Sequence, residues 1–434
     1  MKILYVTGMS VPLRDILSGK RAEEVTHLPG FFQPWYRLAL RGHQVDFVVT
    51  SNSNELSEMN VDWFKIENLK ANIYDPAVEV SIVRRIPRRF FRLFRLIYHV
   101  NKALRENDYD FVICWAFFEG FVGNILANLH GVPCGMRAMG TLTVPELRKR
   151  GSFLTALRHP VEYFSFRLRK TFFLMTDDGT HGDELYQAWR PPSKKYDYLF
   201  WKTGVEFKSI DEITSEFMRP KHDYIFFAAR FDSWKRHDLI VETVKKLHAR
   251  GKPIHLYFAG VIQSKSCFER VMRQVEDANL SAFVHYLGAI PGDQLRLYAY
   301  HAVANIFMYD VSNLGNVFFE TYTTGGVIIG KNDGSLDEYI DSGHNGFIAE
   351  NTDEASKIVE EILSGAHDVR AIKKSAIRDS RSRCISMDDR FDAEVALIER
   401  VIETGETGLR AGDDGICRLK KSDPVCMLTA YEHH

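Results

Sequence analysis

Residues 224–235 read Tyr224-Ile-Phe-Phe-Ala-Ala-Arg-Phe-Asp-Ser-Trp-Lys235. The first six residues are apolar, and the polar remainder carries Arg230 and Lys235, five positions apart. A short apolar run that leads through a charged loop into an amphipathic segment, here 235–250, is typical of a buried parallel strand followed by a helix. This stretch therefore predicts one unit of an α/β fold, with two cations just beyond the strand.

The same alternation of short apolar runs and longer amphipathic segments continues in both directions along the chain. The candidate strands are Ile3–Val6, Gln44–Thr50, Phe111–Trp115, Pro133–Met136, Phe172–Thr176, Tyr198–Trp201, Tyr224–Ala229, His255–Ala259, Phe283–Leu287, Ala304–Met308, Val327–Ile329 and Gly346–Ile348. Alternating strands and helices predict parallel sheets that are covered by helices on both faces. Because 434 residues exceed what one ordinary core holds, we expect two such Rossmann-like domains.

The alternation pauses at Thr203–His222, a charged stretch that we interpret as the linker. This places an amino-terminal, acceptor-binding domain at 1–205 and a carboxyl-terminal, nucleotide-sugar-binding domain at 206–390. Residues 391–405 predict a last helix that we expect to return to the first domain. The glycine-rich, charged tail at 406–434 is predicted to be disordered.

The composition excludes several classes of protein. A net charge of −1 and a pI near 7.0 argue against a nucleic-acid partner. The six cysteines contain no C-x-x-C pair, which favours a reducing compartment over a disulfide frame. No run approaches the roughly 20 apolar residues of a spanning helix, and the amino terminus is too short for a signal sequence. We therefore expect a cytoplasmic protein.

A second polar loop, Asn313-Leu-Gly-Asn-Val-Phe-Phe-Glu320, follows the candidate strand at 304–308. Ligands of open α/β sheets bind beyond the carboxyl ends of the strands. Arg230 and Lys235 suit a diphosphate there, and Glu320 suits the paired hydroxyls of a ribose. A purely structural interpretation is also open. Arg230 and Lys235 would then be solvated cations of a turn, and Glu320 would be a carboxylate stabilised by a helix dipole. Their occurrence at matching positions of successive units favours a sugar-nucleotide site.

These two segments resemble retaining glycosyltransferases of family 4 (glycosyl transferases group 1), which have the GT-B fold of two facing Rossmann-like domains and an interdomain cleft. The family motif G-R-L-x-x-x-K-G corresponds to Ala229–Arg236. The resemblance thus implies that Arg230 and Lys235 bind the donor diphosphate and support catalysis.

The family signature E-G-F-G-L-x-x-x-E aligns with Ser312–Glu320. By this resemblance Glu320 holds the ribose, and Gly315, Asn316 and Val317 form the loop that approaches the phosphates. Ser312 replaces the glutamate that contacts the donor sugar in the family, and Asn313 is the neighbouring substitute.

The amino-terminal half resembles the family more loosely. Met139 occupies the position of a histidine that family members place close to the donor sugar, and Arg137 and Thr141 are the nearest polar candidates. Asp177 and Asp178 follow another strand, where they suit either acceptor hydroxyls or helix capping.

The resemblance implies a retaining enzyme that moves a hexose-type residue from a nucleotide diphosphate sugar, with UDP or GDP as the nucleotide, to a hydroxyl acceptor. A glycan or glycolipid intermediate is the expected acceptor. We expect no metal, because Asp108-Tyr-Asp110 precedes its strand and so lies at the wrong end.

Two alternatives stay open. A nucleotide-sugar-binding pseudoenzyme fits the replacement of two expected groups by Ser312 and Met139, and a sugar-nucleotide epimerase is another GT-B-like chemistry. A dinucleotide-dependent oxidoreductase is disfavoured because the first strand is not followed by G-x-G-x-x-G.

A basic, aromatic-rich segment spans residues 84–105. Its cations are Arg84, Arg85, Arg88, Arg89, Arg92, Arg95, Lys102 and Arg105, and no acidic residue lies between Ser81 and Arg105. Such an amphipathic helix suits an anionic membrane surface, which would make the protein peripheral. It equally suits a domain helix with solvated arginines.

Overall fold

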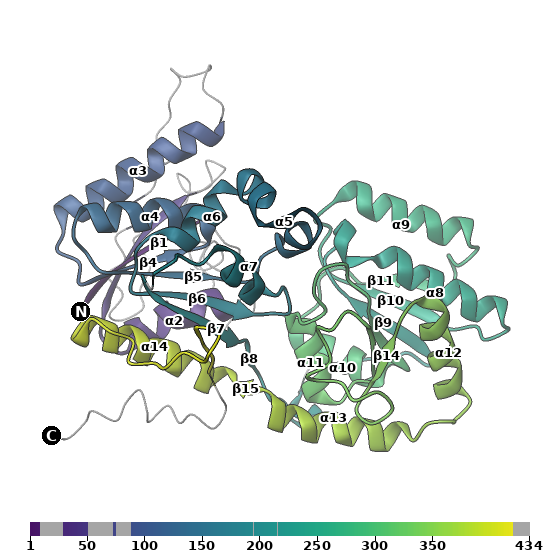
Figure 1. Ribbon diagram of the computed structural model, residues 1–434. Coiled ribbons are helices and arrows are strands. Elements are labelled where there is room, and N and C mark those ends of the chain that lie inside the picture. Colours follow the sequence, from purple (N-terminus) through teal and green to yellow (C-terminus); the bar gives the residue numbers. More distant parts are fainter. Residues whose placement is uncertain (9–28, 51–72, 75–87, 194, 215, 420–434) are drawn as a thin grey trace. The chain divides into compact units, whose positions relative to one another are not determined.

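The computed structural model describes residues 1–8, 29–50, 73–74, 88–193, 195–214 and 216–419. Two compact units divide these residues (Figure 1). Unit 1 takes its described residues from Met1–Asp177, His181–Gly204 and Met387–His434, and unit 2 consists of Asp178–Thr180 and Val205–Ser386. Asp178–Thr180 thus belongs to unit 2 although it lies within the amino-terminal half of the sequence.

Unit 1 is built on a parallel sheet with the strand order β16-β7-β6-β5-β4-β1-β2-β3. Its strands are β1 (Lys2–Gly8), β2 (Gln44–Thr50), β3 (Ile73–Tyr74), β4 (Phe111–Trp115), β5 (Cys134–Ala138), β6 (Phe172–Asp177), β7 (Asp197–Lys202) and β16 (Ile416–Cys417). Its helices are α2 (Pro29–Leu40), α3 (Arg88–Glu106), α4 (Phe117–Leu129), α5 (Val144–Arg158), α6 (Pro160–Arg167), α7 (Gly182–Trp189) and α14 (Met387–Thr404). Alternate strand residues pack against α2 and α14 on one face and against α3, α4, α6 and α7 on the other.

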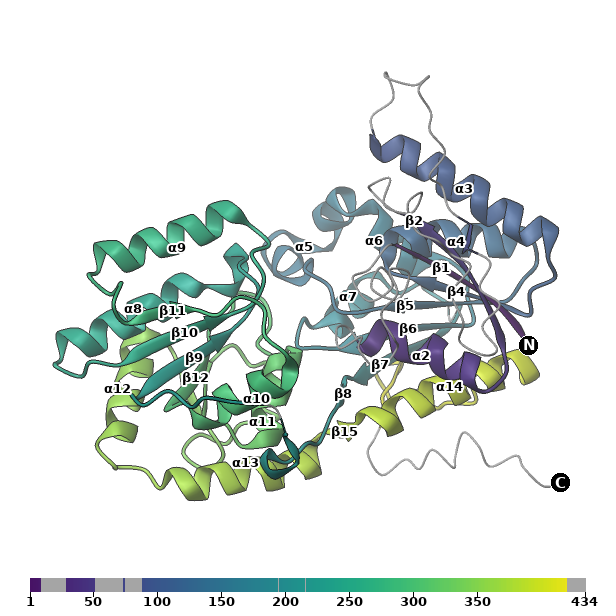
Figure 2. The same ribbon diagram turned by 180° about the vertical axis from the view of Figure 1, so that it is seen from behind.

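Unit 2 is built on a parallel sheet with the strand order β11-β10-β9-β12-β13-β14. Its strands are β9 (Tyr224–Ala228), β10 (His255–Ala259), β11 (Val284–Tyr286), β12 (Ala304–Phe307), β13 (Ile328–Lys331) and β14 (Phe347–Ala349). Its helices are α8 (His237–Ala249), α9 (Lys265–Asp277), α10 (Gly292–His301), α11 (Asn316–Thr324), α12 (Thr352–Leu363) and α13 (Val369–Arg383), with 3₁₀ turns at Ile210–Glu212 and Ser233–Lys235. Helices α8 and α9 cover one face of the sheet and α10 covers the other (Figure 2).

The prediction of two parallel α/β sheets is confirmed, and each of the twelve candidate strands overlaps a strand of the structure. The two-residue strands β3, β8 (Gly204–Val205), β15 (Ile385–Ser386) and β16 were not predicted. They are too short to show a hydrophobic period. The helix expected at 391–405 begins earlier, at Met387, and packs against α2 in unit 1.

The prediction of disorder at 406–434 is wrong for the described part of that tail. Residues Ile416 and Cys417 form β16, which pairs with β7, and both are buried. Thr407 adds a hydrogen bond to the Asp197 carboxylate. A polar, glycine-rich composition concealed two apolar residues that complete the edge of the sheet. The rest of the predicted disordered tail, 420–434, lies outside the described residues.

A buried ion network fastens α14 to the sheet of unit 1. The carboxylate of Glu394 accepts from Nε of Arg137 at 3.0 Å and from Nη1 of Arg390 at 2.8 Å. All three side chains are at most 3% exposed. Arg390 also donates to the carbonyl of Lys202, and Arg137 to the hydroxyl of Thr176. Burial lowers the pKa of Arg390 to about 10, which still leaves its guanidinium charged at neutral pH.

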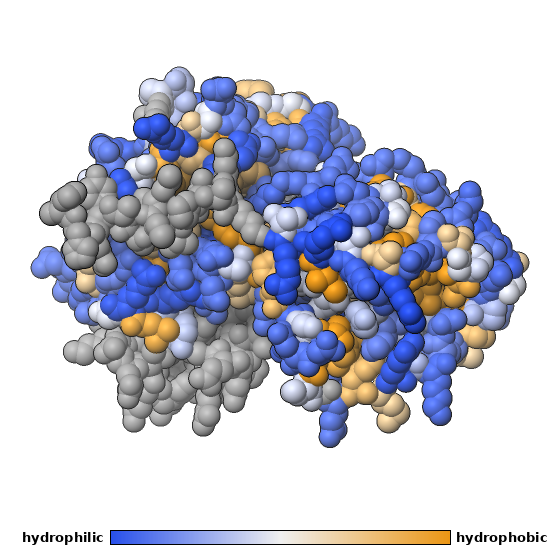
Figure 3. Space-filling model, turned by 90° about the horizontal axis from the view of Figure 1, so that it is seen from below, coloured by the Kyte–Doolittle hydropathy of each residue, from blue (hydrophilic) through white to orange (hydrophobic). Residues whose placement is uncertain are grey.

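No helix in the described ranges is long and apolar enough to cross a membrane. The face drawn in Figure 3 is largely hydrophilic among its coloured residues, with small hydrophobic patches separated by polar ones. Scattered apolar residues of this kind are normal on a protein surface.

Replacing Glu394 by alanine should destabilise unit 1 by about 3–5 kcal/mol, because two buried guanidinium groups lose their counter-ion. Denaturant unfolding followed by circular dichroism measures the change. Asp388→Ala is the matched control, since Asp388 is a carboxylate of the same helix that pairs with Arg37 but is 82% exposed. Its loss should cost under about 1 kcal/mol. Equal losses in both variants would show that the network does not hold α14.

Candidate functional site

The two segments singled out in the sequence lie side by side at the carboxyl edge of the sheet of unit 2. They follow β9 and β12, which are neighbouring strands. The backbone N–H of Asp310 donates to the carbonyl of Trp234 at 3.0 Å, and Arg236 donates to the Asp310 carboxylate at 2.8 Å. The loop after β9 is therefore fastened to the loop that leads into α11.

Both cations of the first segment are at this edge. The guanidinium of Arg230 is half exposed, 3.7 Å from the Asp232 carboxylate. The ammonium of Lys235 lies 3.9 Å from the ring centroid of Trp234 and 3.7 Å from that of Tyr309. Within the described ranges it has no ion pair or hydrogen bond. Burial, and then the charge of Arg230, lowers the pKa of Lys235 to about 7.

Glu320 is the fifth residue of α11, past the first turn, so it is not a helix-start carboxylate. Its side chain keeps some accessible surface but is mostly enclosed by protein. Among the described residues no hydrogen bond or ion pair reaches its carboxylate. Burial raises the pKa of Glu320 to about 7, opposed by the charge of Arg296. The site thus contains a carboxylate with unused hydrogen-bonding capacity.

Between these groups lies the amino terminus of α11. Gly315 precedes the helix, whose first residues are Asn316 and Val317, and no side chain caps it. A Cβ atom built on Gly315 would meet nothing within 4 Å, so the approach is open. Uncapped N–H groups and the helix dipole favour an anion at this position.

Ser312 and Asn313 form hydrogen bonds within their own loop and to two neighbouring loops. The hydroxyl of Ser312 donates to the carbonyl of Asp178 and accepts from the N–H of Leu314. The fully buried Asn313 accepts from the N–H of Tyr309 at 2.9 Å and donates to Asp333 at 2.6 Å. Both side chains thus hold the shape of the loop, and their contact with a donor sugar stays a prediction.

Asp178 and Asp177 differ in their surroundings. Asp178 accepts from the N–H and the hydroxyl of Thr180, at 3.2 and 2.6 Å, and so closes a turn rather than capping α7, whose cap residue is His181. Its charge is close enough to raise the pKa of Lys235. Asp177 ends β6 in unit 1 and is partly exposed.

The other candidates of unit 1 are buried. Arg137 is spent in the ion network with Glu394, which argues against the predicted ligand contact. Thr141 donates to Glu162 at 3.3 Å and accepts from the N–H of Thr143. The sulfur of Met139 accepts a contact from Thr176 at 3.7 Å and packs with the core beneath α2 and α14.

Sequence reasoning missed the residues that support the site. Trp234 and Tyr309 confine the ammonium of Lys235, and Asp333 anchors Asn313. The available signal was positional, because Tyr309 and Asp333 each follow a strand at the same edge of the sheet. Burial of Lys235 between two rings had no signal in the sequence.

Residues 210–379 match the family model described as glycosyl transferases group 1. These residues form a glycosyl transferases group 1 domain. They include both segments of the site, and the chain is a nucleotide-sugar-dependent glycosyltransferase whose acceptor this match does not define. No curated protein sequence matches the chain.

Solved structures of glycosyltransferases share the fold of this one. HepE of Anabaena, in complex with UDP and glucose, superposes with a TM-score of 0.61 at 13% identity, over 93% of this chain and 100% of that one. Sucrose-phosphate synthase from Thermosynechococcus elongatus gives 0.68 at 13% identity, over 94% and 100%. The lipopolysaccharide outer core galactosyltransferase WaaB gives 0.54 at 13%, over 88% and 99%. At this identity the likeness shows the fold, and the predicted GT-B-like class is confirmed.

We predict that the amine of Lys235 becomes nucleophilic near pH 7. Its lowered pKa leaves it increasingly neutral as the pH rises through 7, whereas an ordinary lysine titrates near about 10.4. Competitive acetylation between pH 6 and 9, read by peptide mass spectrometry, should give a labelling midpoint near pH 7. Lys245, an exposed lysine of α8, is the internal reference. Parallel labelling curves for the two lysines would contradict the prediction.

Proposed function

We propose that this glycosyltransferase is a retaining enzyme that transfers a hexose-type residue from a UDP-sugar to a hydroxyl acceptor. In this proposal Arg230, Lys235 and the amino terminus of α11 bind the diphosphate. Glu320 binds the ribose, and Gly315, Asn316 and Val317 lie along the phosphates. The acceptor is a glycan or glycolipid intermediate.

The observation that carries the proposal is the carboxylate of Glu320, which no described residue pairs, on a helix whose start has no side-chain cap. Lys235 likewise has no ion pair or hydrogen bond among the described residues. A buried charged group without a partner is costly. Two ribose hydroxyls donating to Glu320 would relieve that cost, because they favour its ionised form. A diphosphate would likewise favour the charged form of Lys235. The donor thus supplies what both groups lack.

Catalysis in this scheme is electrostatic. The bond between the sugar and the diphosphate breaks with negative charge developing on the leaving phosphate oxygen. Arg230 and a protonated Lys235 stabilise that charge in a partly dry site, where such interactions are strongest. The acceptor hydroxyl attacks the sugar on the face that the nucleotide leaves and gives its proton to the departing phosphate oxygen, and this gives the retained configuration.

UDP is the nucleotide we favour over GDP. HepE, which shares the fold, has been crystallised with UDP and with UDP-glucose.

A catalytically altered, nucleotide-sugar-binding protein is the second candidate. One observation favours it: Ser312, which stands where the family has a glutamate, uses its hydroxyl inside the loop. Residue 312 then offers no carboxylate to the donor sugar. This candidate predicts donor binding without turnover.

Donor binding should stabilise the wild type against heat and leave Glu320→Ala unchanged. A nucleotide at about 100 times its dissociation constant stabilises a protein by roughly 2.7 kcal/mol. Thermal shift assays with UDP, GDP, ADP and dTDP measure this, and we expect UDP to give the largest shift. Glu338→Ala, which removes a carboxylate of unit 2 outside the site, is the control. A full shift in Glu320→Ala would remove Glu320 from the ribose site.

Turnover separates the two candidate functions. Release of UDP from UDP-glucose, with the sugar found on an added hydroxyl acceptor in the same anomeric configuration by NMR, supports the retaining enzyme. UDP-glucose binding with no release over many hours, across a panel of glycan and glycolipid acceptors, would favour the binding protein.

The surface of α3 bears on the acceptor. Leu96 and Val100 of this helix are buried, whereas Phe94, Ile97 and Tyr98 are exposed on its other side. The same helix carries Arg95, Lys102 and Arg105, whereas residues 84–87 and the side chains of 88–92 lie outside what the structure describes. Helix α5 repeats the combination, with Phe153, Leu154 and Leu157 exposed beside Arg148, Lys149 and Arg150.

We propose that this surface of α3 holds the protein on an anionic bilayer, where a lipid-linked acceptor is presented. Exposed aromatic rings suit the interface, and each cation near it contributes about 1 kcal/mol.

The wild type should float with anionic vesicles at low salt and be released at high salt, because the attraction is screened. Phe94→Ser/Tyr98→Ser should bind markedly less, since two aromatic anchors are lost. Met218→Ser is the matched control, because it removes an apolar side chain of unit 2 that is 91% exposed. Absence of wild-type flotation at low salt would contradict the proposal, as would equal flotation of all three proteins.

A further inference from the structure

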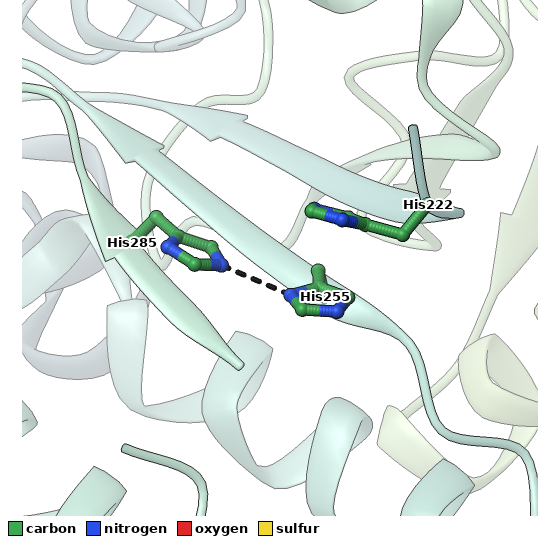
Figure 4. Close-up of side chains that lie close together, drawn as sticks. All are labelled: His222, His255 and His285. Atoms are coloured by element: carbon green, nitrogen blue, oxygen red, sulfur yellow. Dashed lines mark hydrogen bonds between the residues drawn. The ribbon is translucent and has the colours of Figure 1, made fainter. Parts of the chain in front are cut away.

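Three histidines meet at the amino edge of the sheet of unit 2, opposite the edge that carries the donor site. His222 precedes β9, His255 begins β10, and His285 lies in β11 (Figure 4). These three strands are consecutive in the sheet. In the parallel register His255 is beside Tyr224, and His285 is beside Tyr257. Since alternate residues of a strand share a face, all three imidazoles are on the same face.

Their nitrogens are close together. Nδ1 of His255 lies 2.9 Å from Nε2 of His285. The ring of His222 stacks on that of His255, with centroids 3.5 Å apart and planes inclined by 24°. One nitrogen from each histidine lies within 4.8 Å of the other two. Zinc–nitrogen bonds of about 2.0–2.1 Å in a tetrahedral site separate the nitrogens by about 3.3 Å. Side-chain rotations that move these nitrogens by on the order of 1 Å would therefore bring all three within bonding distance of one ion.

We propose that His222, His255 and His285 bind a divalent transition-metal ion of the class that prefers imidazole, zinc being the representative. Three imidazole nitrogens and one water complete a four-coordinate site. Imidazole ligands without a carboxylate favour zinc, copper or nickel over magnesium or calcium.

The surroundings of the cluster suit this assignment. The hydroxyl of Tyr257 lies 2.9 Å from Nε2 of His222, as an outer partner that orients a ligating histidine through its second nitrogen. Burial, followed by the charge of His222, lowers the pKa of both His255 and His285. Both effects favour the neutral imidazole, the form that binds metals.

The metal site would stabilise the fold of unit 2 and would take no part in glycosyl transfer. It ties together the starts of β9, β10 and β11, whereas Arg230 and Lys235 follow the other end of β9. Metal bound only by the folded chain raises its stability. Donor binding and turnover are expected to be unchanged by filling the site. The sequence contains no metal-binding spacing motif for the cluster, because long segments separate the three histidines.

Zinc titration of the full-length chain tests the proposal. The background carries His433→Gln/His434→Gln, since this pair at the chain end can bind zinc by itself. Isothermal titration should find one tight site, and zinc should raise the melting temperature. His255→Gln and His285→Gln should each weaken the affinity at least tenfold and abolish the thermal shift. Cobalt should give the visible absorption of a four-coordinate ion only when both histidines are present.

His367→Gln is the matched control, because it removes a partly exposed histidine of unit 2 outside the cluster. It should bind zinc like the background chain. Circular dichroism and the shift given by UDP check that each variant remains folded. The proposal is overturned if the background chain shows no tight zinc site, or if folded His255→Gln and His285→Gln both bind as the background does.

Discussion

The pairing of β9 with β12 is the constraint on which the rest of unit 2 depends. Because these strands are parallel neighbours, the loops that follow them leave the sheet at the same edge. Asp310 then hydrogen-bonds to Trp234, and Tyr309 closes over Lys235. Two segments that are far apart in the sequence become one site. Without this pairing neither the cation pair nor the helix terminus would face a common ligand.

Burial of unpaired charge gives that site its chemical character. Lys235 and Glu320 both have a pKa near 7, shifted in opposite directions, and the same cause, loss of water, acts on both. Packing of the sheet and helices fixes the backbones of Lys235 and Glu320, and so keeps both side chains in place despite their desolvation. The nucleotide diphosphate of the proposed function would offer compensating groups to each. The site is thus organised before the ligand arrives, which reduces the ordering that binding must drive.

Unit 1 shows the opposite use of buried charge. Arg137 and Arg390 both pair with Glu394, and these bonds hold α14 on the sheet. Sequence reasoning took Arg137 for a ligand group because it is one of the polar residues nearest to Met139, the position of the family's histidine. Its partner is 257 residues away, and no local pattern could reveal that pairing. The same limitation concealed the roles of Ser312 and Asn313, whose partners Asp178 and Asp333 lie on other loops.

The sequence by itself determined the strands, the two parallel sheets and the edge at which Arg230, Lys235 and Glu320 lie. These follow from local periodicity and from the rule that ligands meet the carboxyl ends of parallel strands. Only the tertiary structure decided which polar side chains remain available. Among the residues that the structure describes, Lys235 and Glu320 have no hydrogen-bond or ion-pair partner, whereas Arg137 and Asn313 bond to other residues of the protein. Three histidines that are separated in the sequence meet at one edge. Whether a polar side chain is available to a ligand depends on which residues pack against it. These contacts join distant parts of the chain, so no short stretch of sequence predicts them.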